Sequence, residues 1–327
     1  MTTLYPLKFN PIYKDKIWGG NKIKTVLGKD YGDLPNCGET WEISGVEGNI
    51  SIVADGPLAG RSLVELIDSY KGTLLGDKIY QRYGSEFPLL IKFIDANDDL
   101  SIQVHPDDAL AGTRHDSFGK TEMWYVFQAD EGASLISGFN QETNKQSFME
   151  KFDEGRLMDI LNREQVKAGD VFFIPAGRVH TIGKGLLLAE IQQTSDVTYR
   201  IYDFDRIDAA GQQRELHVTE ALDAMDYGFY DNYKESYNEE INKPVELVTC
   251  DYFTTNKLDI DQVIERKYNH LDSFIIYICF EGTFVLDYLD GKMRVKKGDA
   301  ILLPANLKEV KLIPEERCKM LESYIDQ

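Results

Sequence analysis

A repeated segment constrains the fold of this 327-residue chain more than any other feature of its sequence. The segment 169–176, GDVFFIPA, matches the segment 298–305, GDAILLPA, at Gly, Asp, Pro and Ala, 129 residues later. A Gly-Asp pair, four apolar residues and a closing proline are typical of a tight turn that leads into a buried β-strand. The chain is therefore predicted to contain two related β units.

Short alternating or apolar runs, separated by turn residues, fill most of the remaining sequence. Strands are expected over 39–44, 87–94, 134–139, 186–192, 198–202 and 245–258, and over almost all of the chain after Ser273. Helices are expected to begin at Ser62, to occupy parts of 141–164 and to cover 217–225. Ser62 is predicted to cap its helix together with Glu65, three residues later. This pattern predicts a mainly β protein, an antiparallel sandwich or barrel with short helical segments.

The charge balance excludes one large class of partners. The net charge of −19 disfavours nucleic acid, because a phosphate backbone requires a basic protein face. No apolar run is long enough to cross a membrane, and the N-terminus lacks a basic region followed by an apolar core. The four cysteines lie far apart, as reduced thiols do. We therefore expect a cytoplasmic protein with no membrane and no nucleic-acid partner.

A candidate metal site lies between residues 100 and 125. Gln103 and His105 are two residues apart, as are Lys120 and Glu122, so each pair is expected to share one face of a strand. The polar segment 107–119 between them is expected to be a loop and a candidate lid. Gln, His and Glu can all ligate a divalent cation, and His180, just after the first copy of the repeat, offers a fourth ligand.

The second copy of the repeat keeps the scaffold but lacks this chemistry. Glu309 stands at the position of His180, and no Gln-x-His pair precedes it. These features predict that the second β unit is a structural partner of the first. We expect a catalytic unit over 1–235, with N-terminal strands and small helical insertions, and a structural unit over 236–327.

Specific motifs carry a family resemblance. Gly169-x5-Pro175-x-Gly177-x2-His180 matches the second cupin motif through its histidine, although Lys184 replaces the closing asparagine. The chain resembles the short bacterial form of type I mannose-6-phosphate isomerase, in the cupin superfamily. This resemblance implies a mainly β fold of two cupin-type (jelly-roll) β-barrels with short helical segments, the second barrel degenerate. The further residues that carry this likeness are Trp18-Gly-Gly, Gly38-Glu39-x-Trp41-Glu42-x-Ser44, Gln103-Val-His105-Pro106, Lys120-Thr-Glu122, Glu190 and Tyr199-Arg200-x-x-Asp203.

The resemblance implies a zinc-dependent aldose–ketose isomerase that interconverts mannose 6-phosphate and fructose 6-phosphate through a cis-enediol. It implies one zinc ion per chain, held by Gln103, His105, Glu122 and His180. The catalytic candidates are Arg200, Lys120 and Glu190, and Ser101 matches a further pocket position. The partner is a small-molecule sugar phosphate, and the chain is expected to be a monomer or a homodimer.

The substrate's charge sets a condition on the fold. Lys92, inside an apolar run, is either an edge residue that faces solvent or a contact for phosphate or sugar oxygens. A dianionic phosphate can enter so acidic a protein only if Lys92, Lys120 and Arg200 cluster. We expect the three tryptophans to be core residues, and we expect neither His115 nor His217 to be a ligand.

Two other readings of the site remain. Another metal-dependent cupin, such as a dioxygenase or a nucleotide-sugar isomerase, is a rival within enzymes; dioxygenases of this kind usually have a ligand set richer in histidine. A sugar-binding or regulatory cupin without isomerase activity is the rival from another class. Lys120, Glu190 and Arg200 disfavour the second reading, since a pure binder needs no proton-transfer group.

Overall fold

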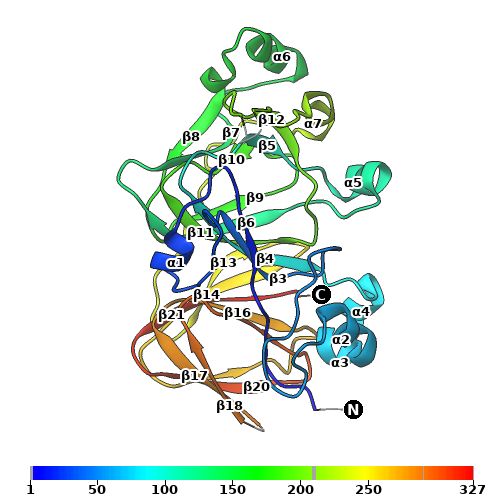
Figure 1. The fold of residues 1–327 in the computed structure, drawn as a ribbon, viewed down its shortest axis with the longest axis vertical. Helices are drawn as coiled ribbons and strands as arrows, with labels where there is room; N and C mark the ends of the chain where they lie inside the picture. Colours follow the sequence, from blue (N-terminus) through cyan, green and yellow to red (C-terminus); the bar gives the residue numbers. More distant parts are fainter. Residues whose placement is uncertain (1–2, 208–210, 290, 327) are drawn as a thin grey trace.

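The computed structural model describes residues 3–207, 211–289 and 291–326. Antiparallel strands dominate this part of the chain and pair in four sheets. The sheets are layered along the long axis of the molecule, as the ribbon in Figure 1 shows, and the two inner sheets pack against each other. The result is two β-sandwiches joined face to face.

The first sandwich contains the residues of the candidate site. Its outer sheet runs in the order β12 (Tyr199–Tyr202), β5 (Ile102–Val104), β10 (His180–Thr181), β7 (Ser134–Phe139) and β8 (Leu161–Gln165). Its inner sheet runs in the order β2 (Ile12–Lys14), β3 (Glu39–Ile43), β4 (Leu89–Ala96), β11 (Leu186–Gln193), β6 (Glu122–Ala129) and β9 (Val171–Ile174).

The second sandwich is built mainly from the C-terminal third of the chain. Its inner sheet runs in the order β1 (Leu7–Lys8), β19 (Ala300–Leu303), β16 (Ile275–Glu281), β21 (Cys318–Tyr324), β14 (Thr254–Ile260) and β13 (Pro244–Thr249). Its outer sheet runs in the order β15 (Ile264–Lys267), β20 (Glu309–Pro314), β17 (Thr283–Tyr288) and β18 (Gly291–Lys296). The strand β1 is exceptional, because the N-terminus supplies it to a sheet made otherwise of C-terminal strands.

The helices are short and lie outside the sheets. They are α1 (Lys22–Thr25), α2 (Leu63–Tyr70), α3 (Gly72–Leu75), α4 (Asp77–Tyr83), α5 (Asp108–His115), α6 (Lys145–Asp153), the 3-10 helix η1 (Leu157–Asp159) and α7 (Val218–Ala224). The predicted cap of α2 is confirmed: the Ser62 side chain accepts from the Glu65 N–H, and Glu65 reciprocates. None of the helices in the described part of the chain is long and apolar enough to span a bilayer.

Three apolar layers hold the four sheets together. One fills the first sandwich around Trp124 and Phe172, and another fills the second sandwich around Tyr277 and Phe284. The third and largest lies between the two inner sheets and also takes in the buried faces of α2, α3 and α4. Burial of apolar surface contributes roughly 25 cal/mol of stabilisation per Å² removed from water, so this shared layer strongly favours the packing of the two sandwiches against each other.

The repeat is confirmed as the same local structure used twice. Asp170 accepts a hydrogen bond from the Lys167 N–H (2.9 Å), and Asp299 accepts one from the Lys296 N–H (3.0 Å). Each glycine before the aspartate has a positive φ, 91° and 87°, which a residue with a Cβ rarely adopts. The buried strands β9 and β19 follow these turns.

Other expectations are met only in part. The fold is mainly β as predicted, but its strands pair in open sheets, so the prediction of two closed barrels is not confirmed. The segment 107–119 was expected to be a loop, and eight of its residues form α5 behind the cap Asp107. The strand expected over 245–258 is a hairpin, β13 and β14, and 141–164 holds α6, η1 and most of β8.

Candidate metal centre and active site

Strand register aligns three polar residues across the outer sheet of the first sandwich. Gln103 on β5 is directly opposite His180 on β10 and, on its other side, opposite Arg200 on β12. Residues directly opposite each other on antiparallel strands share a face of the sheet. The row Arg200–Gln103–His180 therefore points to one side.

The inner sheet carries a second row. Lys92 on β4 is opposite both Trp41 on β3 and Glu190 on β11, and Glu190 is in turn opposite Trp124 on β6. The rings of Trp124 and His180 meet edge to face with centroids 5.4 Å apart, so the two rows face each other across the interior of the sandwich. Lys92 is thus buried on a central strand, which excludes the solvent-facing edge position.

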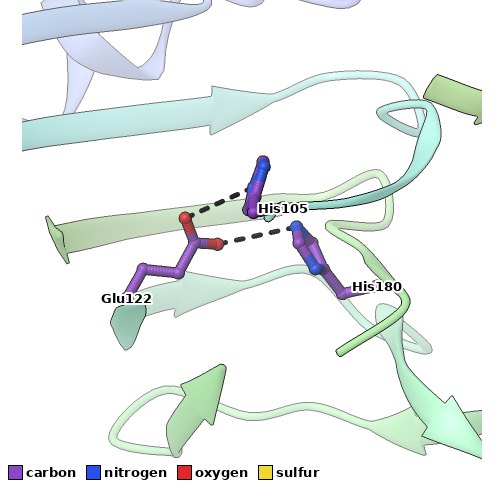
Figure 2. Close-up of side chains that lie close together, drawn as sticks. All are labelled: His105, Glu122 and His180. Carbon is purple, nitrogen blue, oxygen red and sulfur yellow. Dashed lines mark ion pairs between the residues drawn. The ribbon is translucent and has the colours of Figure 1, made fainter. Parts of the chain in front are cut away.

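His105, Glu122 and His180 form a compact, buried cluster between these rows (Figure 2). Glu122 Oε2 lies 3.6 Å from His105 Nε2, and Glu122 Oε1 lies 3.6 Å from His180 Nε2. His105 directly follows β5, whereas Glu122 begins β6 and His180 begins β10. Three strand ends thus bring together three of the four predicted metal ligands.

Backbone carbonyls orient both imidazoles. His105 Nδ1 lies 3.0 Å from the Val197 carbonyl, and His180 Nδ1 lies 2.9 Å from the Arg178 carbonyl. A carbonyl only accepts, so each Nδ1 carries the proton and each Nε2 keeps a lone pair toward Glu122. Burial lowers the pKa of His180 to about 3 and lowers the pKa of His105 well below its ordinary value. Both rings are therefore neutral at pH 7, the form that binds metal.

The Glu122 carboxylate supplies the test of whether a cation fits. It is fully buried, and its Oε1 has no hydrogen-bond partner among the described residues. Burial raises its pKa, and the nearby charge of Glu190 raises it further. A divalent cation among Glu122 and the two Nε2 atoms would satisfy the lone oxygen and offset this cost. The donor set fits such an ion.

Gln103, the fourth predicted ligand, lies beside the cluster. Its amide nitrogen is 3.2 Å from His180 Nε2, and its amide oxygen accepts from Ser101 Oγ at 3.3 Å. The two ends of an amide have nearly the same shape, so a rotation about the last side-chain torsion would turn the oxygen toward the histidines. Gln103 therefore offers either a donor or a ligand oxygen at this position.

Lys120 reaches into the same cluster. Its buried ammonium lies 2.6 Å from Glu122 Oε2 and 2.9 Å from His105 Nε2. A buried cation shared by two ligand side chains contributes little net stability, because its desolvation offsets its attraction to the carboxylate. Such an arrangement is typical of a functional site rather than of a structural ion pair.

A cavity of about 330 Å³ opens beside the cluster. Six of the nine predicted site residues line it: Lys92, Ser101, Gln103, Lys120, Glu190 and Arg200. The other three are the residues of the His105–Glu122–His180 cluster, which Gln103 and Lys120 connect to the cavity. The predicted clustering of Lys92, Lys120 and Arg200 is therefore confirmed.

The Glu190 carboxylate is engaged on both sides. Lys92 Nζ lies 2.9 Å from its Oε1, and Trp124 Nε1 donates to its Oε2 at 3.0 Å. Burial alone would raise its pKa, but the charges of Lys92 and Lys120 outweigh burial and lower the pKa. Glu190 is thus an anion that fixes the Lys92 ammonium at the cavity wall.

Two arginines, Arg200 and Arg214, also line the cavity. Arg200 Nη1 donates to the Glu215 carbonyl (2.7 Å), and its buried Nε has no hydrogen-bond partner among the described residues. Burial and the nearby charge of Arg214 lower the Arg200 pKa. Asp203 accepts from Arg214 Nε at 2.8 Å and from Arg206 Nη2 at 2.6 Å. Asp203 therefore holds the side chain of Arg214, which lines the same cavity as Arg200.

Sequence reasoning missed several residues of the cavity wall. Those not predicted as site residues include Lys16, Glu39, Trp41, Asp196, Thr198 and Arg214. Trp18 and Trp41 are buried as expected, yet both also line the cavity. A signal for Trp41 existed in its motif and in its strand register with Lys92, whereas Arg214 lies in a loop with no local signal.

The remaining histidines lie away from the metal cluster, as predicted. His115 Nε2 lies 2.8 Å from the Tyr199 hydroxyl, and His217 Nδ1 accepts from the Arg200 N–H at 3.2 Å. His217 therefore packs beside a catalytic candidate and holds its backbone. The expected lid over 107–119 is not among the cavity-lining segments, and Arg114 and His115 anchor the far end of α5.

Comparison with known proteins identifies the family. The model of the type I phosphomannose isomerase catalytic domain matches residues 6–131, and the model of the mannose-6-phosphate isomerase cupin domain matches residues 243–325. The mannose-6-phosphate isomerase ManA of Bacillus subtilis is 35% identical, over 97% of this chain and 98% of its own length. The mannose-6-phosphate isomerase of Streptococcus mutans is 36% identical over 93% of each chain.

Solved structures agree with this comparison. The crystal structure of the mannose 6-phosphate isomerase from Bacillus subtilis superposes with a TM-score of 0.89 at 35% identity, covering 98% of this chain and 99% of that one. A phosphomannose isomerase from Salmonella typhimurium has a TM-score of 0.82 at 15% identity, which shows the shared fold alone. The chain belongs to the type I phosphomannose isomerase family.

Proposed function

We propose that this protein is a zinc-dependent isomerase that interconverts mannose 6-phosphate and fructose 6-phosphate through a cis-enediol. The observation that carries the proposal is the buried His105–Glu122–His180 cluster beside a cavity lined by Lys120, Glu190 and Arg200. A volume of about 330 Å³ lies within the range of roughly 300–1,000 Å³ that small-molecule sites occupy.

We assign one metal ion per chain to His105, Glu122, His180 and Gln103. Two imidazole nitrogens, one carboxylate and one amide oxygen leave a divalent ion with residual positive charge, and imidazole-rich sites suit zinc. When bound, the ion supplies an electrophile for the sugar oxygens at the reacting carbons. The carbonyls of Val197 and Arg178 support this role, because they keep both Nε2 lone pairs aimed at the ion's position.

We assign the proton transfer between C2 and C1 to Lys120. Its Nζ lies at the ligand cluster, where the reacting carbons have to sit. Lys120 would take the C2 proton as the neutral amine, a form that a divalent cation held by Glu122 and His105 would favour over the ammonium because like charges repel. Both oxygens of Glu190 are engaged and its pKa is lowered, so this carboxylate is a weak base. In this assignment Glu190 positions Lys92, and Lys92 donates to a sugar oxygen together with Ser101.

We assign the substrate phosphate to the Arg200 and Arg214 end of the cavity. Neighbouring strands lie about 4.8 Å apart, so Arg200, two strands from His180, is roughly 10 Å away along the sheet. An extended six-carbon sugar phosphate bridges a distance of this order between its reacting carbons and its phosphate. Guanidinium groups suit this end because they bind phosphate oxygens through paired hydrogen bonds.

We extend the proposal to the organisation of the chain. Residues 1–235 form the catalytic unit, except that their strand β1 joins a sheet of the second unit. Residues 236–327 form the rest of this second cupin unit, which holds no metal. The second copy of the repeat supports this division, because Glu309 stands there at the position of His180. The enzyme acts in the cytoplasm as a monomer or a homodimer.

The purified protein is expected to convert mannose 6-phosphate to fructose 6-phosphate in a coupled isomerase assay. Treatment with a chelator is expected to abolish turnover, and added zinc is expected to restore it, because the neutral histidines and Glu122 have no other means of activating the substrate. Metal analysis before and after treatment gives the stoichiometry, for which one zinc per chain is expected.

Two outcomes would contradict the proposal. Full activity in metal-free protein would exclude the zinc mechanism, and turnover of another sugar phosphate without turnover of mannose 6-phosphate would exclude the substrate. Binding of mannose 6-phosphate without turnover, measured calorimetrically on zinc-loaded protein, would favour a sugar-binding or regulatory cupin instead.

A further inference from the structure

The loop 107–119 joins the two halves of the metal cluster. His105 lies just before it, and Lys120 and Glu122 lie just after it. The loop closes on itself: the Lys120 N–H donates to the Pro106 carbonyl at 3.0 Å. Gly119 packs so tightly against the start of the loop that a Cβ would lie 2.5 Å from the backbone nitrogen of Asp108. The position of Lys120 therefore depends on how firmly this closure is held.

The Asp108 carboxylate, at the start of the loop, accepts hydrogen bonds that hold the two ends of the loop together. Its Oδ1 accepts from the Gly119 N–H at 2.8 Å and from Gln193 Nε2 at 2.9 Å. Its Oδ2 accepts from the Tyr252 hydroxyl at 2.9 Å. These donors come from three separate places: the end of the loop, the last residue of β11, and the turn between β13 and β14 in the second sandwich. One exposed carboxylate thus ties the loop to both sandwiches.

Gln193, which donates to Asp108, also forms hydrogen bonds with Thr121, the residue after Lys120. Its Oε1 accepts from the Thr121 N–H at 2.8 Å, and its own N–H donates to the Thr121 carbonyl at 3.1 Å. The backbone is therefore held at Gly119 and again at Thr121, one residue before and one residue after Lys120. The Lys120 ammonium in turn reaches His105 and Glu122.

We propose that Asp108 is a positioning residue that fixes the backbone of Lys120, and that Tyr252 extends this control to the second sandwich. The proposal rests on the proposed function, in which Lys120 moves the proton. The second unit then has a task in the reaction although it holds no metal. A small displacement of a proton-transfer group lowers turnover steeply while binding of the substrate is little affected.

The test compares two adjacent exposed aspartates. Asp108→Ala is expected to lower kcat for mannose 6-phosphate by about tenfold, with KM and zinc content unchanged. Asp107→Ala is the matched control: Asp107 caps α5 through the Leu110 N–H at 2.8 Å, a bond that stays within the helix. Its kcat is expected to remain within about twofold of wild type. Equal losses in both variants would mean that only the stability of α5 matters, which would overturn the proposal.

Two further variants separate the three hydrogen bonds. Asp108→Asn keeps an acceptor oxygen for Gly119 and Gln193 and is expected to recover most of the kcat that alanine loses. Tyr252→Phe is expected to lower kcat by about two- to threefold. Tyr237→Phe is its control, because the Tyr237 hydroxyl also reaches the first sandwich, at the Gly169 carbonyl (2.7 Å), but far in the chain from Lys120. No loss in Tyr252→Phe would remove the second sandwich from the proposal.

Hydrogen exchange gives a readout independent of catalysis. The amides of residues 119–121 are expected to exchange faster in Asp108→Ala than in wild type or Asp107→Ala, because their closure opens more often. Unchanged exchange there would overturn the positioning role whatever the kinetics. A wild-type protein that fails to isomerise mannose 6-phosphate would instead overturn the proposed function, so the two failures remain distinguishable.

Discussion

His180→Ala is expected to lose the bound metal and to lower kcat/KM for mannose 6-phosphate by about a thousandfold or more. His180 is fully buried, and its Nε2 lies 3.6 Å from Glu122 Oε1. Removing it takes one ligand nitrogen out of the His105–Glu122–His180 cluster, so the remaining donors bind a cation more weakly. The measurements are zinc per chain by mass spectrometry and initial rates in the coupled assay.

His270→Ala is the matched control for this variant. His270 is exposed and lies in the second sandwich, so its loss is expected to change neither zinc content nor rate. His180→Gln, which restores a polar side chain, guards against simple misfolding and is expected to fold with weakened zinc binding. One zinc per chain together with wild-type rates in both His180 variants would contradict the metal assignment.

Arg200→Ala is expected to lower kcat/KM by about 10²- to 10³-fold while the protein keeps its zinc. Arg200 lines the cavity, and its buried Nε lacks a partner among the described residues, so the side chain is arranged to receive an anion. The Arg200 Nη1 and backbone N–H donate to Glu215 and His217 rather than to the side chains of the proposed ligands, so we expect metal binding not to depend on this residue. Steady-state kinetics and metal analysis on the same preparation test both halves of the prediction.

Arg163→Ala and Arg200→Lys are the controls. Arg163 is an exposed residue of β8, at the far edge of the same sheet, and its loss is expected to leave the rates unchanged. Lysine at position 200 keeps the charge but not the paired donors, so an intermediate rate is expected. Wild-type constants in Arg200→Ala would remove this residue from the substrate site.

The regular parts of the fold were predictable because their signals are local. The turns that precede β9 and β19 require one residue that adopts a positive φ and one side chain that accepts a hydrogen bond. The adjacent glycine and aspartate supply these two properties in both turns. The helix α5 was missed because Ala111 is its only buried residue within the described chain, so it shows no apolar periodicity. Its cap, Asp107, and its tertiary tie at Asp108 stabilise it instead.

The His105–Glu122–His180 cluster was predictable for a different reason. His105, Glu122 and His180 belong to motifs with fixed spacing, and the repeat placed His180 at a strand end. Arg214 and Asp196 could not be found in this way, because loops bring them to the cavity and loop paths depend on distant contacts such as the Arg214–Asp203 pair. Whether the strands close into barrels could not be predicted from the sequence either, because closure depends on strand register across the whole sheet.

The strand β1 constrains the order in which this protein can fold during its synthesis. Leu7 and Lys8 pair with Leu302 and Ile301, and the Lys8 ammonium lies 2.7 Å from Asp299. During synthesis β1 emerges long before β19, so its backbone lacks this ladder partner until β19 has been made. Until then β1 is a strand whose backbone groups are open to wrong pairing. This sheet can therefore be completed only after β19 has been synthesised, and a chain cut between the two sandwiches leaves β19 without its edge partner.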